Sequence, residues 1–376
     1  MAGLYLHIPF CKTRCIYCGF YSSTDSSFRQ EYVEALCREL VLRKAYIKGE
    51  QVKTIYLGGG TPSQLTLPEL QHIFNCIYKE YAVAEDAEIT LEGNPDDMTE
   101  DYVQGLASLP VNRISMGVQT FDDAKLKFLR RRHSSGQALQ AVDICRNAGF
   151  TNLSIDLIYG LPGEDDAAWH RDVETAVNLH VPHLSAYCLM FEEGTPLFRM
   201  QQTGRVKEEG EEQTLRFYTY LMERLQQAGY EHYEISNFCV PGYRSRHNSS
   251  YWNGQLYLGC GASAHSYDGM SRQWNVASVS AYINAIKQGR ISCEKEVLSA
   301  TERYNDMIVT RLRTKEGLSL PELLSGSGKK LHDYCLKNAR LALEDGNLEI
   351  SKEHLRLTNR GLFISDEIMS DLLWVD

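Results

Sequence analysis

The first half of the chain alternates short apolar runs with longer amphipathic stretches, a pattern typical of βα units that build a parallel sheet. Strands are predicted at residues 3–9, 54–57, 88–91, 113–118, 152–158 and 183–189. Helices are predicted between them at residues 28–45, 67–81, 99–108, 136–148 and 166–179. The six units are two fewer than a complete (β/α)8 barrel contains. In such folds the chemistry lies at the carboxyl ends of the strands.

Beyond residue 195 the periodic signal is weaker. Residues 208–228 predict one amphipathic helix whose acidic start suits the helix dipole, and residues 234–238 and 258–267 predict strand-to-turn segments. Helices are predicted again at residues 301–313, 320–324, 331–343 and 366–373, with short apolar pieces at 348–350 and 355–357. We therefore expect three parts: a barrel (1–195), an extension of the barrel (196–298) and a small winged-helix-like domain (299–376).

Composition describes an ordinary globular protein of 376 residues, with 43% hydrophobic residues and a net charge of -10. Because phosphate binding needs a concentrated basic face, nucleic acid is not an expected partner. The chain shows no leader-like start and no apolar run long enough to span a bilayer, so a cytoplasmic location is expected. The 11 cysteines are odd in number, and eight are scattered through apolar segments, which argues against a disulfide framework.

The other three cysteines, Cys11, Cys15 and Cys18, carry the strongest chemical signal. A structural zinc site requires four ligands and a redox dithiol requires two cysteines. Three thiolates on one short loop instead fit a [4Fe–4S] cluster with one open iron. The alternative is that these are reduced thiols that cluster by chance.

The spacing C-x3-C-x2-C resembles the radical S-adenosylmethionine (SAM) superfamily. This resemblance implies an α/β fold with a partial (β/α)6 barrel and two cofactors, a [4Fe–4S] cluster and SAM. It also implies that the open iron chelates the methionine moiety of SAM, and that an electron from the cluster cleaves the sulfonium to a radical. The protein supplies binding, orientation and shielding for that chemistry.

Polar and glycine residues stand where the predicted strands end. A glycine run at residues 58–60 precedes Thr61, and Glu92, Gln119 and Asp156 each interrupt an apolar run. A buried polar residue must meet a partner, which is either another side chain or a ligand. The glycine run alone is equally typical of a tight strand-to-helix turn.

These segments resemble the coproporphyrinogen-dehydrogenase-like branch of the superfamily. The resemblance implies a SAM site formed by Tyr5, Tyr17, Gly59, Gly60, Thr61, Glu92, Gln119, Arg131 and Asp156. Arg131 lies within three consecutive arginines, which are equally typical of a solvated charge run.

Two departures separate this chain from the coproporphyrinogen III dehydrogenases. Those enzymes have a fourth cysteine two positions after the third, where this chain has Phe20. They also have a substantial extension before the first cysteine, where this chain has ten residues. Both departures favour a resemblance to the HemW family of heme chaperones.

A third feature favours the same family. The segment His247-Asn-Ser-Ser-Tyr-Trp252 resembles its H-N-x-x-Y-W motif, which implies that His247 holds heme. Imidazole is a common axial ligand of heme iron, and Arg244 and Arg246 could pair with the propionates. The alternative is a junction loop in which His247 caps a backbone carbonyl and Trp252 fills a groove.

The sequence therefore predicts a heme chaperone that binds a [4Fe–4S] cluster and SAM and transfers heme to an acceptor protein, with no residue assigned a catalytic role. The alternative is an enzyme that oxidatively decarboxylates two propionates of coproporphyrinogen III. An electron donor is expected if SAM is cleaved, and a homodimer and a peripheral membrane association stay open.

Overall fold

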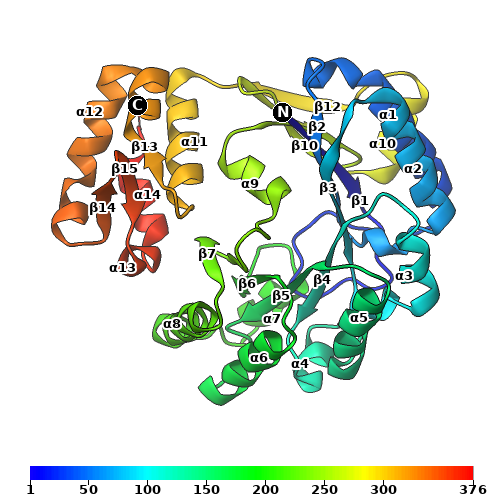
Figure 1. Ribbon diagram of the computed structural model, residues 1–376, viewed down its shortest axis with the longest axis horizontal. Helices are drawn as coiled ribbons and strands as arrows, with labels where there is room; N and C mark the ends of the chain where they lie inside the picture. Colours follow the sequence, from blue (N-terminus) through cyan, green and yellow to red (C-terminus); the bar gives the residue numbers. More distant parts are fainter. Residues whose placement is uncertain (376) are drawn as a thin grey trace.

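A parallel sheet forms the first half of the molecule in the computed structural model, which describes residues 1–375 (Figure 1). Its strands are β1 (Ala2–Ile8), β2 (Val52–Gly59), β3 (Val83–Gly93), β4 (Arg113–Gln119), β5 (Asn152–Tyr159) and β6 (His183–Cys188). Each pairs in parallel with the next along the chain. All six predicted strands are present.

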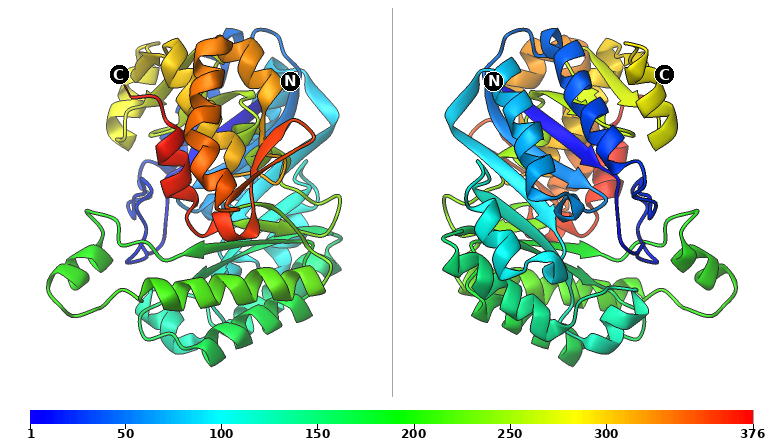
Figure 2. Two further views of the ribbon diagram at one scale, coloured as in Figure 1. Left: turned by 90° about the vertical axis from the view of Figure 1, so that its left-hand side faces the viewer. Right: turned by 90° about the vertical axis from the view of Figure 1, so that its right-hand side faces the viewer.

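Helices follow the strands and cover the outer face of the sheet (Figures 1 and 2). They are α1 (Arg29–Leu42), α2 (Leu67–Glu80), α3 (Glu100–Leu106), α4 (Asp123–Phe128), α5 (Ser135–Asn147) and α6 (Asp166–Asn178). Short 3-10 turns lie at Lys44–Ile47, Pro62–Gln64 and Pro95–Asp97. Most of these helices begin at side-chain caps; in α2, Thr66 and Glu69 form a capping box. The two-turn helix α4 was not predicted, because its few residues carry little periodic signal.

Side chains alternate between the two faces of the sheet along each strand, which gives an apolar outer face and a polar interior. In β1, Leu4, Leu6 and Ile8 are buried in the main hydrophobic cluster with the helices, whereas Tyr5 and His7 point to the other face. The polar interruptions of the predicted strands therefore line the inside of the curved sheet, which is where a barrel fold places its ligands.

The sheet continues at both edges without closing. Beyond β6 it adds β8 (Asn237–Cys239) and β7 (Glu231–Glu234) in antiparallel pairing. Beyond β1 it adds β9 (Leu256–Cys260) in parallel pairing, then β10 (His265–Tyr267), β11 (Ser271–Asn275) and β12 (Cys293–Val297). The result is a 12-stranded open sheet whose centre is a partial (β/α)6 barrel, as predicted.

Four helices belong to the segment between the barrel and the C-terminal part. They are α7 (Pro196–Gln202), α8 (Glu211–Gln227), α9 (Arg246–Trp252) and α10 (Val279–Lys287). The prediction of a long helix near 208–228 is confirmed by α8. The H-N-x-x-Y-W segment is the short helix α9 rather than a loop, and the Ser245 side chain accepts a hydrogen bond from the Asn248 amide at its start.

The C-terminal part has its own hydrophobic cluster, separate from that of the barrel (Figure 1). Its helices are α11 (Ala300–Leu312), α12 (Leu320–Glu344), α13 (Asn359–Leu362) and α14 (Ser365–Leu372). Its small sheet contains β13 (Leu318–Ser319), β15 (His354–Leu357) and β14 (Leu348–Ser351) in that order. Helices that precede and follow the hairpin of β14 and β15 give the predicted winged-helix-like arrangement. In residues 1–375, no helix is both long and apolar enough to cross a membrane.

Candidate cofactor site

The three predicted cluster ligands, Cys11, Cys15 and Cys18, lie on one loop that follows β1. The loop is tied at its base, where the Cys11 amide donates to the Ser23 carbonyl at 2.9 Å. It is tied again where the Ile16 amide donates to the backbone at the end of α4 at 3.3 Å. All three thiols are partly exposed and free. A tethered loop with three free thiols is suited to holding one cluster from one side.

The thiols are not gathered around a single point. No described group of three or more His, Cys, Asp or Glu side chains is arranged to hold one metal ion. The case for a four-iron cluster therefore rests on the spacing and accessibility of the thiols.

Arg131 points at the cysteine loop rather than into solvent. Its Nη1 lies 3.5 Å from the Cys15 Sγ, and its Nη2 donates to the Asn94 side chain at 2.7 Å and to the Gly117 carbonyl. Its Nε has no hydrogen-bond partner within the described chain. Arg132 instead pairs with acidic residues of a neighbouring loop. A partly buried guanidinium with a spare donor beside a thiol is arranged for a negatively charged ligand.

The glycine run brings the ends of β1 and β2 together. The Thr61 hydroxyl lies 3.3 Å from the Cys11 Sγ. A Cβ on Gly60 would lie 2.7 Å from the backbone of Pro9, and Gly59 has a φ of 108°. These glycines are therefore needed for the turn itself, and a side chain at either position would displace the backbone next to the cysteine loop.

Two carboxyl groups face the interior and are partly exposed there. The Tyr56 hydroxyl donates to Glu92 at 2.6 Å, and the Gly59 amide donates to Glu92 at 3.2 Å. Burial raises the pKa of Glu92 to about 7, and the charge of Asp156 adds to this effect. Burial likewise raises the pKa of Asp156 to about 6. Both groups therefore change charge near neutral pH and can respond to a cationic ligand.

Gln119 has a strained backbone at the end of β4. Its φ is 73°, a left-handed value that non-glycine residues rarely adopt, and the strand register shifts just before it. Its side chain folds back over Gly117, where an added Cβ would lie 2.6 Å from the Gln119 Nε2. Strain of this kind is typical of ligand sites.

The two predicted tyrosines occupy different levels. Tyr17 lies beside Cys15 and Arg131, and burial raises the pKa of its hydroxyl. Tyr5 lies deeper, where its ring stacks on Tyr56 at a centroid distance of 6.2 Å. Tyr17 therefore belongs to the cysteine loop itself, whereas Tyr5 lies in the interior of the barrel.

Arg113 is a buried cation that the sequence analysis did not single out. Its side chain is 1% exposed, and its Nε and Nη1 have no partner in the described structure. Its charge lowers the pKa of Glu92 and Asp156 against the larger effect of burial. The available signal was the same as for the carboxyl groups, a polar residue within an apolar strand.

His247 is a packed residue of the barrel interior in this conformation. Its side chain is 1% exposed; its Nδ1 lies 2.8 Å from the Thr54 hydroxyl and its Nε2 lies 2.9 Å from the Tyr251 hydroxyl. Its ring stacks on Tyr56 at 5.0 Å. Burial lowers the pKa of His247 to about 3, so the ring is neutral. Ligation of iron would require these contacts to break. This conformation therefore agrees better with the alternative, in which His247 is a packed structural residue, although its partners are two hydroxyl groups and not a backbone carbonyl.

The neighbouring arginines are already paired with protein carboxylates. Arg244 binds Glu231 at 2.9 Å and Glu316 at 2.7 Å. Arg246 pairs with Asp86 at 3.5 Å. The suggestion that these arginines hold heme propionates is therefore not supported by this arrangement.

Aromatic side chains remain exposed at the cysteine loop and in the barrel. Phe20, which stands where the dehydrogenases have a fourth cysteine, is 70% exposed. Tyr187 at the end of β6 is 43% exposed, yet the surrounding protein still raises the pKa of its hydroxyl. Exposed aromatic surface next to a cofactor loop is suited to a flat apolar ligand.

Comparisons with known proteins agree with this geometry. Residues 5–176 match the family model of the radical SAM superfamily, and residues 298–364 match that of the HemN C-terminal domain. The heme chaperone HemW of Mycobacterium tuberculosis (strain CDC 1551 / Oshkosh) is 34% identical over 99% of this chain and 94% of its own length. HemW of Bacillus subtilis (strain 168) is 32% identical over 99% of both chains. This chain belongs to the HemW family.

The solved structure of coproporphyrinogen III oxidase (HemN) from Escherichia coli has the same fold. It superimposes with a TM-score of 0.85 and 23% identity, covering 99% of this chain and 89% of that one. Membership of the radical SAM superfamily implies a [4Fe–4S] cluster and SAM as cofactors. The residues fit both: three accessible thiols on a tethered loop, an Arg131 Nε without a partner and two interior carboxyl groups.

Proposed function

We propose that the chain is a heme chaperone, which binds heme and transfers it to an acceptor protein. The observation that carries this proposal is the identity of 31–34% with relatives named heme chaperone HemW, over nearly the whole chain. The exposed Phe20 supports it, because a phenyl ring cannot replace the thiol that the decarboxylating enzymes carry there.

We further propose that Cys11, Cys15 and Cys18 hold the cluster and that SAM lies at the carboxyl ends of the strands. Its binding set would be Tyr17, Gly59, Gly60, Thr61, Glu92, Gln119, Arg131 and Asp156, with Tyr5 beneath them. When bound, the cluster supplies an electron to SAM. The protein binds and orients SAM, and the carboxyl groups of Glu92 and Asp156 offer negative charge to its cationic groups.

The cluster assignment is tested by single alanine variants at the three cysteines. Each should lose most of its iron and sulfide after anaerobic reconstitution, because one ligand of three is removed. Cys335→Ala is the matched control, since this thiol is buried in the C-terminal part. Normal iron content in the cysteine-loop variants would reject the assignment.

The chaperone assignment is tested by parallel assays on the reconstituted protein. We expect it to bind heme and to show no decarboxylation of coproporphyrinogen III with SAM and a reductant. Formation of protoporphyrinogen would establish the enzyme alternative. Failure to bind heme would reject the chaperone. In the same assays, His247→Ala tests the predicted heme ligand through the visible spectrum.

Partners and location follow from the same proposal. An electron donor is required if SAM is cleaved, and association with a membrane surface or a second copy would bring the chaperone to its acceptor. We propose a reducing, cytoplasmic location, in which the cluster and the free thiols persist.

A further inference from the structure

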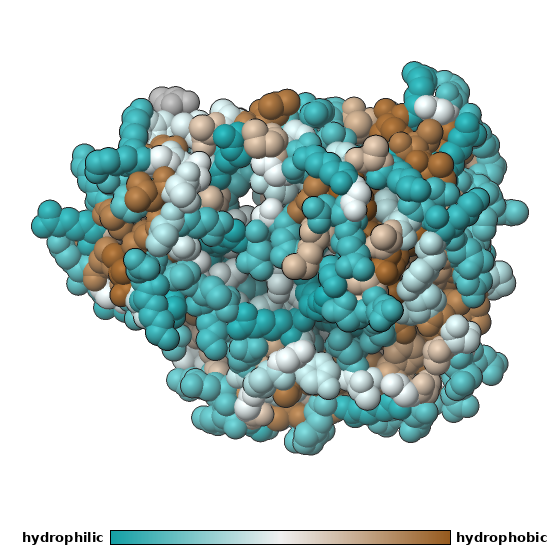
Figure 3. All heavy atoms as spheres, turned by 45° about the horizontal axis from the view of Figure 1, so that its top comes forward, coloured by the Kyte–Doolittle hydropathy of each residue, from teal (hydrophilic) through white to brown (hydrophobic). Residues whose placement is uncertain are grey.

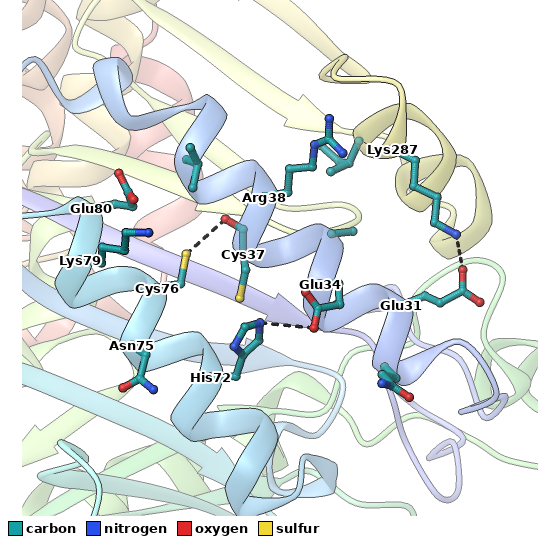
Figure 4. A pocket seen from close by; sticks show the side chains of 14 residues that line it. Glu31, Glu34, Cys37, Arg38, His72, Asn75, Cys76, Lys79, Glu80 and Lys287 are labelled. Atoms are coloured by element: carbon teal, nitrogen blue, oxygen red, sulfur yellow. Dashed lines mark hydrogen bonds and ion pairs between the residues drawn. The ribbon is translucent and has the colours of Figure 1, made fainter.

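Two cysteines outside the barrel lie close to each other on neighbouring helices. Cys37 belongs to α1 and Cys76, 39 residues later, to α2. The Cys76 thiol donates a hydrogen bond to the Cys37 carbonyl at 3.3 Å (Figure 4). Both residues line an open groove of about 740 Å³ between α1, α2 and α10. Hydrophilic and apolar surface alternate in Figure 3 on the side where Figure 1 draws these helices.

The two thiols differ in their exposure. Cys37 is 7% exposed and belongs to the main hydrophobic cluster, whereas Cys76 is partly exposed in the groove. A small polar molecule in the groove therefore reaches Cys76 more easily than Cys37. Thiols that react with peroxides in proteins are typically accessible and stand next to a second cysteine, which resolves the oxidised product. The pair has this arrangement.

The contact between the two side chains also makes Cys76 the more acidic thiol. The hydrogen bond from Cys37 lowers the pKa of Cys76, and the Lys79 ammonium adds to this effect. Burial and the carboxylates of Glu80 and Glu34 oppose it without cancelling it. The same hydrogen bond, together with burial, raises the pKa of Cys37. Because the thiolate is the nucleophile, Cys76 is the attacking group and Cys37 keeps its proton.

We propose that Cys76 is a peroxide-reactive thiol and that Cys37 resolves its product into a reversible disulfide between α1 and α2. The Cys76 thiolate attacks one oxygen of a hydroperoxide, the O–O bond breaks, and the other oxygen takes a proton from solvent and leaves as water or an alcohol. The Cys37 thiol then attacks the sulfur of the resulting sulfenic acid and releases water. The two thiols thus lose two electrons to the hydroperoxide, and a thiol reductant restores them.

The disulfide joins the two βα units that carry the proposed cofactor site. Helix α1 follows the cysteine loop, and α2 follows the glycine run and Thr61. Cross-linking residues that are 39 positions apart restricts the unfolded chain, so the oxidised protein should melt at a higher temperature than the reduced one. The inference goes beyond the chaperone function and does not depend on it.

The pairing is tested by peptide mass spectrometry on the full-length protein with its cluster reconstituted. The protein is exposed to hydrogen peroxide, and its remaining thiols are alkylated. Trypsin then cleaves after the basic residues that flank each cysteine and gives the peptides 30–38 and 54–79, with one cysteine in each. We expect one cross-linked species that lacks two hydrogen atoms and separates on reduction. A link from either peptide to a different cysteine would reject the pairing.

Serine variants separate the roles of the two thiols. In Cys37→Ser the sulfenic acid at Cys76 should persist and be captured by dimedone, because the resolving thiol is absent. In Cys76→Ser, Cys37 should stay a free thiol, and peroxide should no longer raise the melting temperature. A dimedone adduct at Cys37 with none at Cys76 would overturn the assignment of roles.

Cys188 is the matched control for exposure. It is an exposed thiol, yet partial desolvation raises its pKa to about 11. Cys76 should therefore react with peroxide about tenfold or more faster than Cys188, as measured by the loss of alkylation at each site over time. Equal rates would show that exposure alone governs the reaction. Oxidation of Cys188 without any link between Cys37 and Cys76 would reject the inference.

Discussion

Single polar residues decide the character of the barrel interior. Near the amino ends of the strands they satisfy one another: the two ring nitrogens of His183 lie 2.7 Å from the Ser154 hydroxyl and 2.8 Å from the Tyr233 hydroxyl. Near the carboxyl ends, Glu92 and Asp156 stay partly exposed. The sequence predicted that each polar interruption needs a partner. Each has a protein partner, Tyr56 for Glu92 and Ser185 for Asp156, and the depth of the residue along its strand decides how much of it stays exposed beyond that partner.

The raised pKa values of the interior carboxyl groups predict a pH dependence. In the folded protein Glu92 and Asp156 hold their protons up to about pH 7 and pH 6, above their ordinary range. Their contribution to stability is therefore present at acid pH and is lost as the pH rises through these values. Because SAM carries cationic groups, we expect it to raise the melting temperature more at pH 8 than at pH 5.5.

The variant Glu92→Gln isolates one of these groups. Without SAM at pH 8 it should melt about 2–4 °C higher than the parent, because the buried charge of Glu92 is removed. With SAM it should show a smaller pH dependence. Thermal melts at both pH values check this, and an undiminished dependence in the variant would contradict the assignment.

Removal of the His247 ring should destabilise the fold as well as test heme binding. His247→Ala leaves the Thr54 and Tyr251 hydroxyls without their partner and opens a cavity, at a cost of about 2–4 kcal/mol. His265→Ala, at an exposed ring that stacks on Trp274, should cost less than about 1 kcal/mol. Urea unfolding measures both. Equal midpoints for the two variants would show that His247 is not packed as described.

At the scale of elements, length decided most of the outcomes. The longer periodic helices, such as α2 and α6, begin where the sequence predicted them, because caps and apolar stripes both mark them. The helices α4, α7, α9, α10 and α13 were not predicted. Four of them have seven or fewer residues, which give two turns at most, and tertiary contacts rather than periodicity stabilise them. The nine-residue helix α10 was missed as well, whereas α3, with seven residues, was predicted.

The kink in α12 gives a test at this scale. The sequence predicted two helices, 320–324 and 331–343, and the structure places Gly328 between them with a φ of 80° and a ψ of 168°. Gly328→Ala should destabilise the protein by more than about 1 kcal/mol, because alanine does not tolerate a positive φ. Gly326→Ala, with no positive φ and no close neighbour for its Cβ, should stabilise it by about 0.5–1 kcal/mol. If both variants shifted the urea midpoint in the same direction, the positive φ of Gly328 at the kink would be contradicted.

At the scale of the whole molecule, α9 joins the barrel interior to the C-terminal part. His247 at its start packs on β2, and Trp252 at its end lies under the Arg313 guanidinium at 5.1 Å. The Trp252 carbonyl also accepts a hydrogen bond from Arg311 at 2.7 Å. The H-N-x-x-Y-W motif is therefore one link between the barrel and the C-terminal part, beside the backbone bridge between Glu234 and Thr314.

This connection predicts how the molecule unfolds. Trp252→Ala should weaken the packing of the C-terminal part by about 1–3 kcal/mol, so that this part melts before the barrel. In scanning calorimetry, the melting temperatures of the C-terminal part and the barrel should then lie further apart in the variant than in the parent. Arg340→Ala, at a side chain that is 80% exposed, is the control and should change neither. An unchanged calorimetric trace for Trp252→Ala would show that Trp252 does not stabilise the packing of the C-terminal part against the barrel.

The sequence by itself determined the order of the βα units, the cysteine loop and the open barrel, because these depend on residues close together in the chain. Tertiary structure decided the rest. The pairing of β9 with β1 joins Ala2 to Leu256, and a hydrogen bond joins Thr54 to His247, 193 residues later; no local pattern records either contact. Contacts between distant segments likewise hold His247 in the barrel interior through Thr54 and turn Arg131 to the cysteine loop through Asn94, which is why neither placement could be predicted from the neighbouring residues alone.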